Sequence, residues 1–483
     1  MIKQIVPCVV VFSFICLFAQ PPNTSWQKTY GGAESERGNC VRQTTDGGYI
    51  IAGWTDTYDI DWVDAWLVKT NSSGDTLWTK TFGGNSEDKF NEVRQTTDGG
   101  YIIVGTTGSL GAGLDDVWLI KTDQNGNQQW AKTFGANGQE QGNSVYQTVD
   151  GGYIITGSSK AYGSTFDNLF LIKTTSSGDT IWTKKYGGPS WDIGNSVQET
   201  NDGGYIIAGK TSSYGAGSQD VWLIKTTASG DTLWTKTFGG SSGDGANSIQ
   251  QTSDNGFIIA GYKDSNGPNR KDFWLIKTDA FGNLVWDNGY GGDDDDEACS
   301  VQQTSDGGYI LAGYTESYGD GLDDIWVVKT NAFGGSVWSK VFTGSYNECS
   351  NSVQQTTDGG YIITGYTSTF GAGGSDIWLI KTEPDLSIIN TEQYVPGTYH
   401  LFQNYPNPFN PITTIKFRLS QRTYVKVDLF NLAGQKITSL VSEQLNGGFH
   451  ELKLDASALA SGIYMYRLQC GAFTDAKKLL VLK

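Results

Sequence analysis

A repeat of 52 residues constrains this chain more than any other feature. The turn Asp-Gly-Gly-Tyr, or its variant Asp-Asn-Gly-Phe, recurs seven times without insertion or deletion. The turns begin at Asp46, Asp98, Asp150, Asp202, Asp254, Asp306 and Asp358. Two tryptophan motifs, Trp-Leu-Ile-Lys-Thr and Trp-Thr-Lys-Thr-Phe-Gly-Gly, recur in the same phase. Repeats of this length stack one small unit on the next, so we expect a repetitive body rather than an ordinary globular domain.

Each period is typical of four short strands, which we name A to D. In one copy, residues 351–356 form strand A, 360–367 strand B and 376–382 strand C, while 76–82 illustrate strand D. Strands B and C are apolar almost continuously, as in sheets that are covered on both faces. Since four strands cannot cover their own two faces, neighbouring copies must do so. The sequence therefore predicts an all-β fold, a seven-bladed β-propeller with four-stranded blades.

The residues before the first strand A predict how the ring closes. Residues 24–30 repeat strand D, and the last copy ends after strand C at Thr382. We expect Thr24 to Tyr30 to lie beside Asp376 to Thr382, so that an N-terminal strand closes the last blade and removes a free edge. This strand order and closure resemble those of WD-repeat propellers, although the repeat motif differs. An open superhelix is the alternative, and it would need capping repeats.

Charge and histidine content narrow the function. The chain has 34 basic and 51 acidic residues in 483, a net charge of −17, which opposes binding to nucleic acid or anionic lipid. Its two histidines, His400 and His450, lie outside the repeats, so the propeller has no imidazole for general base catalysis or for zinc. We expect a monomeric binding module, with no enzymatic activity and no cofactor.

Polar residues that recur in all seven copies are interpreted as structural, and function is expected where the copies differ. An acidic residue precedes each strand A, at Glu36, Asp88, Glu140, Asp192, Asp244, Asp296 and Glu348. We interpret each as capping backbone N–H groups in its own blade, with a cation-collecting ring as the alternative. The lysine of each strand C, such as Lys69, is expected to orient the strands and to hydrate a blade edge.

The loops between strands B and C differ between copies and carry aromatic residues beside acidic ones. The candidate ligand-binding residues are Tyr58, Trp62, Tyr162, Tyr214, Tyr318 and Phe370. Aromatic faces stack on sugars or cations, and carboxylates accept hydrogen bonds from hydroxyl groups. This pattern therefore indicates a glycan or cationic ligand. The alternative is that these rings only pack their loops.

One loop before a strand A concentrates acidic side chains. Asp293, Asp294, Asp295 and Asp296 supply hard oxygen ligands that suit Ca²⁺, but they lack the alternating spacing of a helix-loop-helix calcium loop. Calcium is therefore the one metal that the sequence suggests. The alternative is a solvated acidic loop that binds no metal.

Residues 1–20 have the form of a secretory signal, with Lys3, an apolar run and Ala19-Gln20 at the cleavage position. No later stretch is apolar enough for a transmembrane anchor. Four cysteines follow, Cys40, Cys299, Cys349 and Cys470. We interpret them as small buried thiols, and the sequence leaves open a disulfide among the first three.

The pattern changes after Thr382. Residues 21–382 are assigned to the propeller, 383–403 to a linker and 404–483 to a small C-terminal β-sandwich with five strands, in which 415–419, 424–431, 449–455, 462–470 and 476–482 alternate apolar and polar residues. The segments YPNPFNP (405–411), VDLFNLAGQKI (427–437), LASGIYMYRL (459–468) and KKLLVLK (477–483) follow in order.

At these segments the chain resembles the type A C-terminal sorting domain of the type IX secretion system. The resemblance implies export through the outer membrane with the type IX machinery as partner, to the surface or the medium, and removal of this domain. It implies nothing about what the propeller binds. The expected function is a secreted or cell-surface module that recognises an extracellular glycan or protein. The alternatives are a polysaccharide hydrolase or lyase and a purely structural surface protein.

Overall fold

The computed structural model describes residues 20–57, 62–160, 166–264, 270–385, 399–401, 404, 411–420, 422–431, 434–445, 448–457, 459–471 and 473–481. The regular elements of these residues are all strands. The chain divides into two compact units, Met1–Thr391 and Glu392–Lys483. Within the described residues there is no helical segment with the length and apolar character that crossing a membrane requires.

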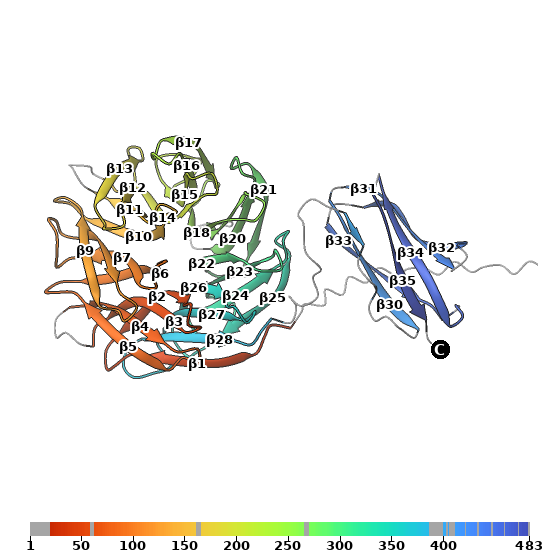
Figure 1. The fold of residues 1–483 in the computed structure, drawn as a ribbon, viewed down its shortest axis with the longest axis horizontal. Coiled ribbons are helices and arrows are strands. Elements are labelled where there is room, and N and C mark those ends of the chain that lie inside the picture. The colour runs from red at the N-terminus through yellow and green to blue at the C-terminus, as the bar shows by residue number, and fades with distance from the viewer. Residues whose placement is uncertain are drawn as a thin grey trace, which may run out of the picture. The chain divides into compact units, whose positions relative to one another are not determined.

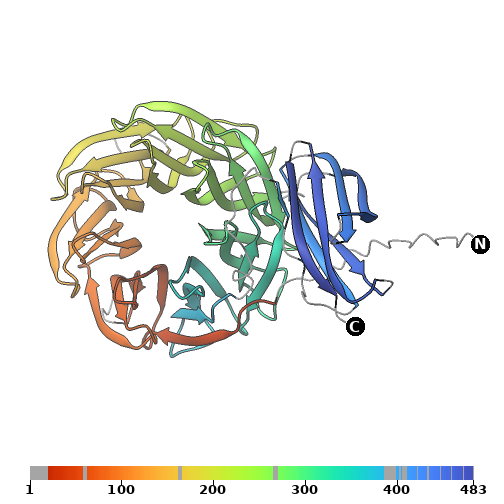
Figure 2. The same ribbon diagram turned by 45° about the vertical axis from the view of Figure 1, so that its right-hand side comes forward.

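The first unit is a ring of seven four-stranded antiparallel sheets, which Figures 1 and 2 show around a central axis. We number the blades 1 to 7 in the order of their strands A. The A strands are β2 (Glu36–Gln43), β6 (Asp88–Gln95), β10 (Glu140–Gln147), β14 (Asp192–Glu199), β18 (Asp244–Gln251), β22 (Asp296–Gln303) and β26 (Glu348–Gln355). The B strands are β3 (Tyr49–Thr55), β7 (Tyr101–Thr107), β11 (Tyr153–Ser159), β15 (Tyr205–Thr211), β19 (Phe257–Asp264), β23 (Tyr309–Thr315) and β27 (Tyr361–Thr367).

The outer half of each blade consists of strands C and D. The C strands are β4 (Asp64–Thr70), β8 (Asp116–Thr122), β12 (Asn168–Thr174), β16 (Asp220–Thr226), β20 (Lys271–Thr278), β24 (Asp324–Thr330) and β28 (Asp376–Thr382). The D strands are β5 (Thr76–Phe82), β9 (Gln128–Phe134), β13 (Thr180–Tyr186), β17 (Thr232–Phe238), β21 (Leu284–Tyr290), β25 (Ser336–Phe342) and β1 (Thr24–Tyr30).

The ring closes as the sequence predicts. Strand β1 pairs antiparallel with β28, with Thr29 opposite Trp378, and completes the sheet β1-β28-β27-β26. Blade 7 then packs on blade 1, where Val41 and Ile51 share a buried cluster with Ile362. The closed seven-bladed propeller is therefore confirmed, and the open superhelix is excluded.

Apolar surface between the blades holds the ring together. Strands B and C are buried along most of their length. Each D-strand tryptophan also meets the first aromatic residue of strand B in the next blade, as Trp78 does with Tyr101 at 6.1 Å between ring centroids. The contact recurs at the closure, where Trp26 of β1 lies 5.8 Å from Tyr49. Edge-to-face pairs of this kind add about 0.5–1.5 kcal/mol beyond the area they bury.

The carboxylates before strand A are buried and act as caps. Glu36 accepts a hydrogen bond from the Gly32 N–H at 2.9 Å and another from the Thr55 hydroxyl at 2.9 Å. Asp88 accepts from the Gly84 N–H at 3.0 Å. The capping interpretation is confirmed, because these oxygens face the backbone of their own blade.

The prediction for the strand C lysines is half right: they help to orient the strands, but they do not hydrate the blade edges. Lys69 and its equivalents are buried rather than exposed at blade edges. The Nζ of Lys69 lies 2.9 Å from Asp46 of the Asp-Gly-Gly turn and donates to the Thr70 carbonyl at 2.8 Å. The lysine therefore joins the A–B turn to strand C. The sequence prediction treated these lysines as members of exposed ion pairs and did not anticipate this role.

The second unit is a sandwich of two sheets, β29-β30-β33 and β32-β31-β34-β35. Its strands are β29 (His400–Leu401), β30 (Ile412–Leu419), β31 (Thr423–Asn431), β32 (Lys436–Leu445), β33 (Gly448–Asp455), β34 (Gly462–Cys470) and β35 (Phe473–Val481). Residues of both sheets, such as Phe417 and Leu468, share one buried cluster. The five predicted strands are present, and the sequence missed β29 and β32. Strand β32 is mostly exposed and carries no alternating apolar signal.

Candidate binding site in the central channel

The seven A strands enclose a cavity of about 270 Å³ on the axis of the ring. Its lining comes from corresponding positions of each strand, beginning at the level of Asn39 and ending at the level of Arg42. The wall can therefore be read as stacked rings at the levels of Asn39, Cys40 and Arg42. Only the last ring lacks one blade, because blade 3 carries Tyr146 there, outside the lining. A residue type that recurs around a ring has a structural role in each blade. A blade with a different residue type at that level has lost this role or replaced it.

The asparagine ring joins neighbouring blades. Each A strand has a β-bulge at this position, as between Gly38 and Cys40 in β2, and a bulge re-aims the side chain it carries. The Nδ2 of Asn39 donates to the Phe90 carbonyl of blade 2 at 2.8 Å, and Asn351 closes the ring onto Gly38 at 3.0 Å. Cys299 replaces asparagine in blade 6 and has no amide to donate.

Two further rings make the same kind of connection, which we call an interblade latch. In blades 3 to 6 the serine hydroxyl accepts from a backbone N–H of the following blade, as Ser196 does from Ile249 at 3.3 Å. Two residues later, the glutamine oxygen does the same, as Gln250 accepts from Gln303 N–H at 2.6 Å. These side chains satisfy backbone groups that would otherwise face the channel unpaired.

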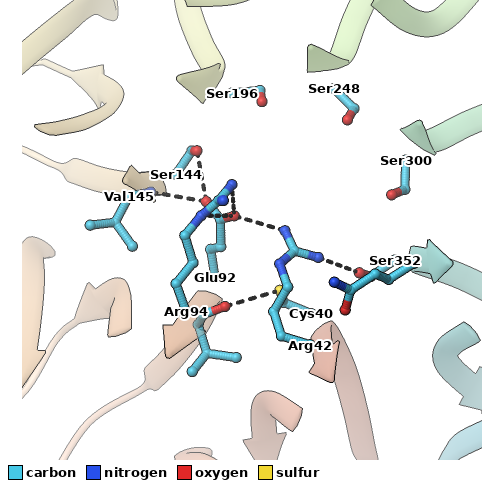
Figure 3. Close-up of polar contacts among 12 residues, drawn as sticks. Cys40, Arg42, Glu92, Arg94, Ser144, Val145, Ser196, Ser248, Ser300 and Ser352 are labelled. Atoms are coloured by element: carbon cyan, nitrogen blue, oxygen red, sulfur yellow. Dashed lines mark hydrogen bonds and ion pairs between the residues drawn. The ribbon is translucent and has the colours of Figure 1, made fainter. Parts of the chain in front are cut away.

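Three charged residues interrupt these rings in blades 1 and 2. Glu92 takes a serine position, while Arg42 and Arg94 take glutamine positions. One Glu92 oxygen, Oε1, lies 3.0 Å from Arg42 Nη2 and 2.8 Å from Arg94 Nη2. Figure 3 shows the three side chains together on one side of the channel. They are the charged residues of the cavity lining, so its formal charge is +1.

Glu92 keeps the latch while it holds both arginines. Its other oxygen, Oε2, accepts from the Val145 N–H at 2.9 Å and from the Ser144 hydroxyl at 2.7 Å. Burial alone would raise the pKa of Glu92, but the charges of Arg94 and Arg42 outweigh it and lower the pKa below the usual value. The carboxylate is therefore ionised at neutral pH.

A second variable region lies where strand A meets strand B at the channel end nearest the D–A loops. Two positions that pair directly across these strands vary between blades, and we call this set the mouth: the strand A residue differs in every blade, and the strand B residue is tyrosine in blades 5 to 7 and differs in the other four. The strand A members are Arg37, Lys89, Gln141, Ile193, Gly245, Glu297 and Cys349. The strand B members are Trp54, Thr106, Ser158, Lys210, Tyr262, Tyr314 and Tyr366. No other paired positions along strands A and B vary so much in size, charge and aromatic character.

Blades 7, 1 and 2 place cations against aromatic rings at the mouth. The Arg37 guanidinium lies 4.0 Å from the Tyr366 ring centroid and 5.6 Å from that of Trp54. Lys89 follows, with its Nζ 5.7 Å from the Trp54 ring. Arg37 is exposed and Trp54 half-buried. An exposed cation beside an aromatic face provides both a planar stacking surface and hydrogen-bond donors.

Blades 4 to 6 place a charged cluster at the mouth. Lys271 lies 2.9 Å from Glu297 and over the Tyr262 ring at 4.4 Å. The Tyr314 hydroxyl donates to the same carboxylate at 3.3 Å. Burial lowers the pKa of nearby Lys210, and the charge of Lys271 adds to this effect while Glu297 opposes it.

The cysteines add no nucleophile to this region. All four are free thiols, and Cys40 and Cys349 are buried. Burial raises the pKa of Cys40, and it raises that of Cys349 to about 12. These thiols are protonated at neutral pH, and a thiol is a weaker nucleophile than a thiolate.

The structure places the aromatic loop candidates in separate blades. Tyr214, Tyr318 and Phe370 are 40–47% exposed, and each packs on the strand C tryptophan of its own blade at 5.1–5.3 Å. Tyr214 also lines an open groove with Trp222. Trp62 is 46% exposed. Tyr58 and Tyr162 lie outside the described residues, so their role stays a prediction, as does ligand binding by the other four.

Part of the acidic loop is already used in hydrogen bonds. Asp296 accepts from the Gly292 N–H at 3.0 Å, and Asp295 accepts from the Lys271 N–H at 3.0 Å. In the described part of the chain, no three carboxylate, thiol or imidazole groups are placed to hold a metal ion together. Calcium binding by Asp293 to Asp296 stays a prediction.

The sequence reasoning missed the channel residues, although the sequence contained the signal. The sequence prediction compared the copies in the B–C loops, where the residues often differ from copy to copy. The same comparison along strand A shows Glu92 among serines and Arg42 and Arg94 among glutamines. What the sequence could not show is that these positions face one cavity.

Fold and channel together define a closed seven-bladed propeller with a polar, partly charged axial cavity, followed by a small β-sandwich. Residues 403–482 match the family described as secretion system C-terminal sorting domain. This finding confirms the resemblance at the C-terminus, and it makes the chain a secreted or cell-surface protein that interacts with the type IX secretion machinery. The YPNPFNP segment lies outside the described residues except for Pro411, as do residues 1–19.

No curated protein matches the chain. Among solved structures, a fungal alcohol oxidase of the AA5 family in complex with copper is 10% identical, with a TM-score of 0.46, and the match covers 96% of this chain and 100% of that one. Sqt1 from Chaetomium thermophilum is 11% identical with a TM-score of 0.40, over 82% and 96% of the two chains. A protein of unknown function from Dyadobacter fermentans is 10% identical with a TM-score of 0.40, over 75% and 99%. Likeness at this level carries no argument about function.

Proposed function

We propose that the propeller is an extracellular binding module that recognises a glycan or protein through the mouth of its central channel. The observation that carries this proposal is the position of the variable residues. The strand residues that recur between blades are used in caps, turn ties and interblade latches, whereas no two blades have the same pair of mouth residues. Closure of the ring does not require these differences, because all seven blades pack in the same way whatever residue stands at the mouth. We therefore attribute the variation at Arg37, Trp54 and Tyr366 to ligand binding.

The chemistry of the mouth supports a ligand with flat apolar faces and many hydroxyl groups. Trp54 supplies a stacking surface, and Arg37 and Lys89 supply charged donors beside it. Glycans present both features, and so do aromatic or acidic side chains of proteins. The aromatic loop residues, such as Tyr214, extend the same chemistry toward the rim.

The test is an array of surface and extracellular polysaccharides and proteins, probed with the chain from residue 21 onward. The proposal expects at least one class to bind. Trp54→Ala should weaken that binding about tenfold or more, since a buried aromatic anchor contributes about 2 kcal/mol or more. The control is Trp191→Ala, which removes a tryptophan that is 48% exposed in the D–A loop before β14. Absence of any bound class would favour the purely structural alternative.

A polysaccharide hydrolase is the second candidate, because Glu316 in blade 6 has the raised pKa that a general acid needs. Burial raises the pKa of Glu316, and the neighbouring Asp323 raises it further. Burial likewise raises the pKa of Asp323. Release of reducing sugar from a bound polysaccharide, abolished by Glu316→Gln without loss of binding, would establish this activity.

A further inference from the structure

The channel cavity differs in charge from the rest of the chain. The whole sequence has a net charge of −17, whereas the cavity lining has two guanidinium groups and one carboxylate. The side chains of Arg42 and Arg94 are only 24% and 29% exposed, and Glu92 is 10% exposed. A half-buried charge without a partner is unfavourable, so the uncompensated positive charge requires an explanation.

The fold does not require these arginines. In blades 4 to 7 the same two ring positions are serine and glutamine, and the glutamines at this level latch onto the next blade. Arg42 and Arg94 cannot accept a hydrogen bond, so the corresponding latch is lost where they stand. Blades 1 and 2 thus lose hydrogen-bond acceptors and gain charge.

The two arginines retain donors that point to no protein acceptor among the described residues. Arg94 donates hydrogen bonds to Glu92 alone, through Nε at 3.0 Å and Nη2 at 2.8 Å, and its guanidinium also lies 4.8 Å from the Tyr146 ring centroid, so its Nη1 group has no acceptor among the described residues. Arg42 donates through Nη1 to the Val41 carbonyl and to Ser352 at 3.3 Å, and through Nη2 to Glu92. A guanidinium has five N–H donors, and pairs of them match the two oxygens of a carboxylate.

The opposite wall is neutral and rich in hydroxyl and amide groups. Ser196, Ser248 and Ser300 lie across the channel from Glu92 (Figure 3), and the asparagine and glutamine rings lie above and below them. A cavity of about 270 Å³ is smaller than the roughly 300–1,000 Å³ usual for drug-sized ligands. Its occupant is therefore small, hydrophilic and anionic at one end.

We propose that Arg42 and Arg94 bind the carboxylate of a uronic acid, free or at the end of an acidic glycan, while the serine, asparagine and glutamine rings bind its hydroxyl groups. The inference deepens the proposed function and rests on it, because the mouth would be the entrance for such a ligand. Glu92 fixes both guanidinium groups in place, which lowers the entropy lost when the ligand carboxylate binds.

The test compares D-glucuronate with its neutral amide, D-glucuronamide, by calorimetric titration of the chain from residue 21 onward. Glucuronate should bind at least tenfold more tightly than the amide. The difference should shrink as NaCl is raised from 50 to 500 mM, because salt screens the charge interaction. Inorganic phosphate serves as a second probe, since equal binding of phosphate would show a general anion site and overturn the assignment to a uronic acid.

The decisive variant gives blades 1 and 2 the same channel residues that blades 4 to 7 already have. Arg42→Gln, Glu92→Ser and Arg94→Gln together place serine and glutamine at positions where the other blades already use them. This variant should fold with unchanged stability and lose glucuronate binding at least tenfold. Lys80→Gln on the outer strand β5 also removes one positive charge, and it should change the affinity less than twofold.

The outcomes separate this inference from the proposed function. If an array ligand binds and Trp54→Ala weakens it, but the triple variant binds glucuronate as the unmodified chain does, the carboxylate site is wrong and the mouth remains correct. If neither glucuronate nor any array ligand binds the chain, the proposed function fails and this inference fails with it.

Discussion

At the scale of single residues, the seven copies act as internal controls for one another. A side chain that recurs in each copy has a structural partner, as Asp46 has in Lys69 and Glu36 in the Gly32 N–H. Where one copy departs from the others, the replacement either still meets the structural need or is retained for another purpose. Asn255 is an example of the first kind, because asparagine tolerates the left-handed backbone of its turn, and Glu92 with its arginines is an example of the second.

Asn255 stands where six other turns have glycine, and its φ of 64° is in the left-handed region. Gly47 at the same place in blade 1 has a φ of 81°. Side chains other than those of glycine, asparagine and aspartate adopt this conformation at a cost of about 1–2 kcal/mol. We predict that Asn255→Ala lowers the free energy of unfolding by about 1 kcal/mol, measured by urea denaturation. Asn255→Gly is the control and should leave it within about 0.5 kcal/mol, although it loses the hydrogen bond from Asn201.

The turn carboxylates predict how stability depends on acid. Burial alone would raise the pKa of Asp98, but hydrogen bonds from Thr96 and Lys121 outweigh it and lower the pKa to about 2. The unfolded value is about 3.9, so this carboxylate stabilises the fold fully above about pH 4 and loses its contribution as the pH falls through about 2. We predict that unmodified chain and Asp98→Asn differ in urea midpoint at pH 6 and converge toward pH 2. A constant difference over this range would contradict the prediction.

Residue roles were predictable from sequence only in part. The need for positive φ at Gly47 and the capping by Glu36 follow from local chemistry that the repeat displays. The burial of Lys69 does not, because it depends on how the A–B turn folds over strand C. Glu92 was visible as an exception, but its contact with Arg42 joins residues of two different blades.

At the scale of elements, closure by β1 is the feature on which the ring depends. Strand β1 covers the edge of β28, and Trp26 carries the aromatic contact across to blade 1. The spacing of the repeats predicted this pairing, since a lone strand D was left without a sheet. Strand β32 of the sandwich could not be predicted in the same way, because an exposed strand has no apolar alternation to reveal it.

Removal of β1 should therefore open the ring. We predict that a chain beginning at residue 31 is destabilised and associates through the free edge of β28, measured by thermal unfolding and light scattering. Addition of a synthetic peptide of residues 21–31 should restore the unfolding temperature. A peptide with the same composition in scrambled order is the control. An unchanged unfolding temperature in the shortened chain would show that β1 does not close the ring.

At the scale of the whole molecule, the two units have different roles. The C-terminal sandwich belongs to the part that matches the sorting family and accounts for export. The propeller provides a closed ring whose repeated polar residues satisfy one another, and the copies differ in the channel, its mouth and the B–C loops. Among the described aromatic loop residues, Tyr214, Tyr318 and Phe370 each pack on a tryptophan of their own blade, whereas the mouth residues of neighbouring blades touch, as Arg37 and Tyr366 do.

The most direct test of this account compares mouth and rim in one titration series, with the tightest array ligand and three forms of the chain. Arg37→Ala with Trp54→Ala removes the cation–aromatic stack of the mouth, and Tyr214→Ala with Tyr318→Ala removes two exposed rim rings. The account predicts that the mouth pair weakens the affinity more than tenfold, while the rim pair changes it less than threefold. A strong loss from the rim pair with no loss from the mouth pair would contradict it.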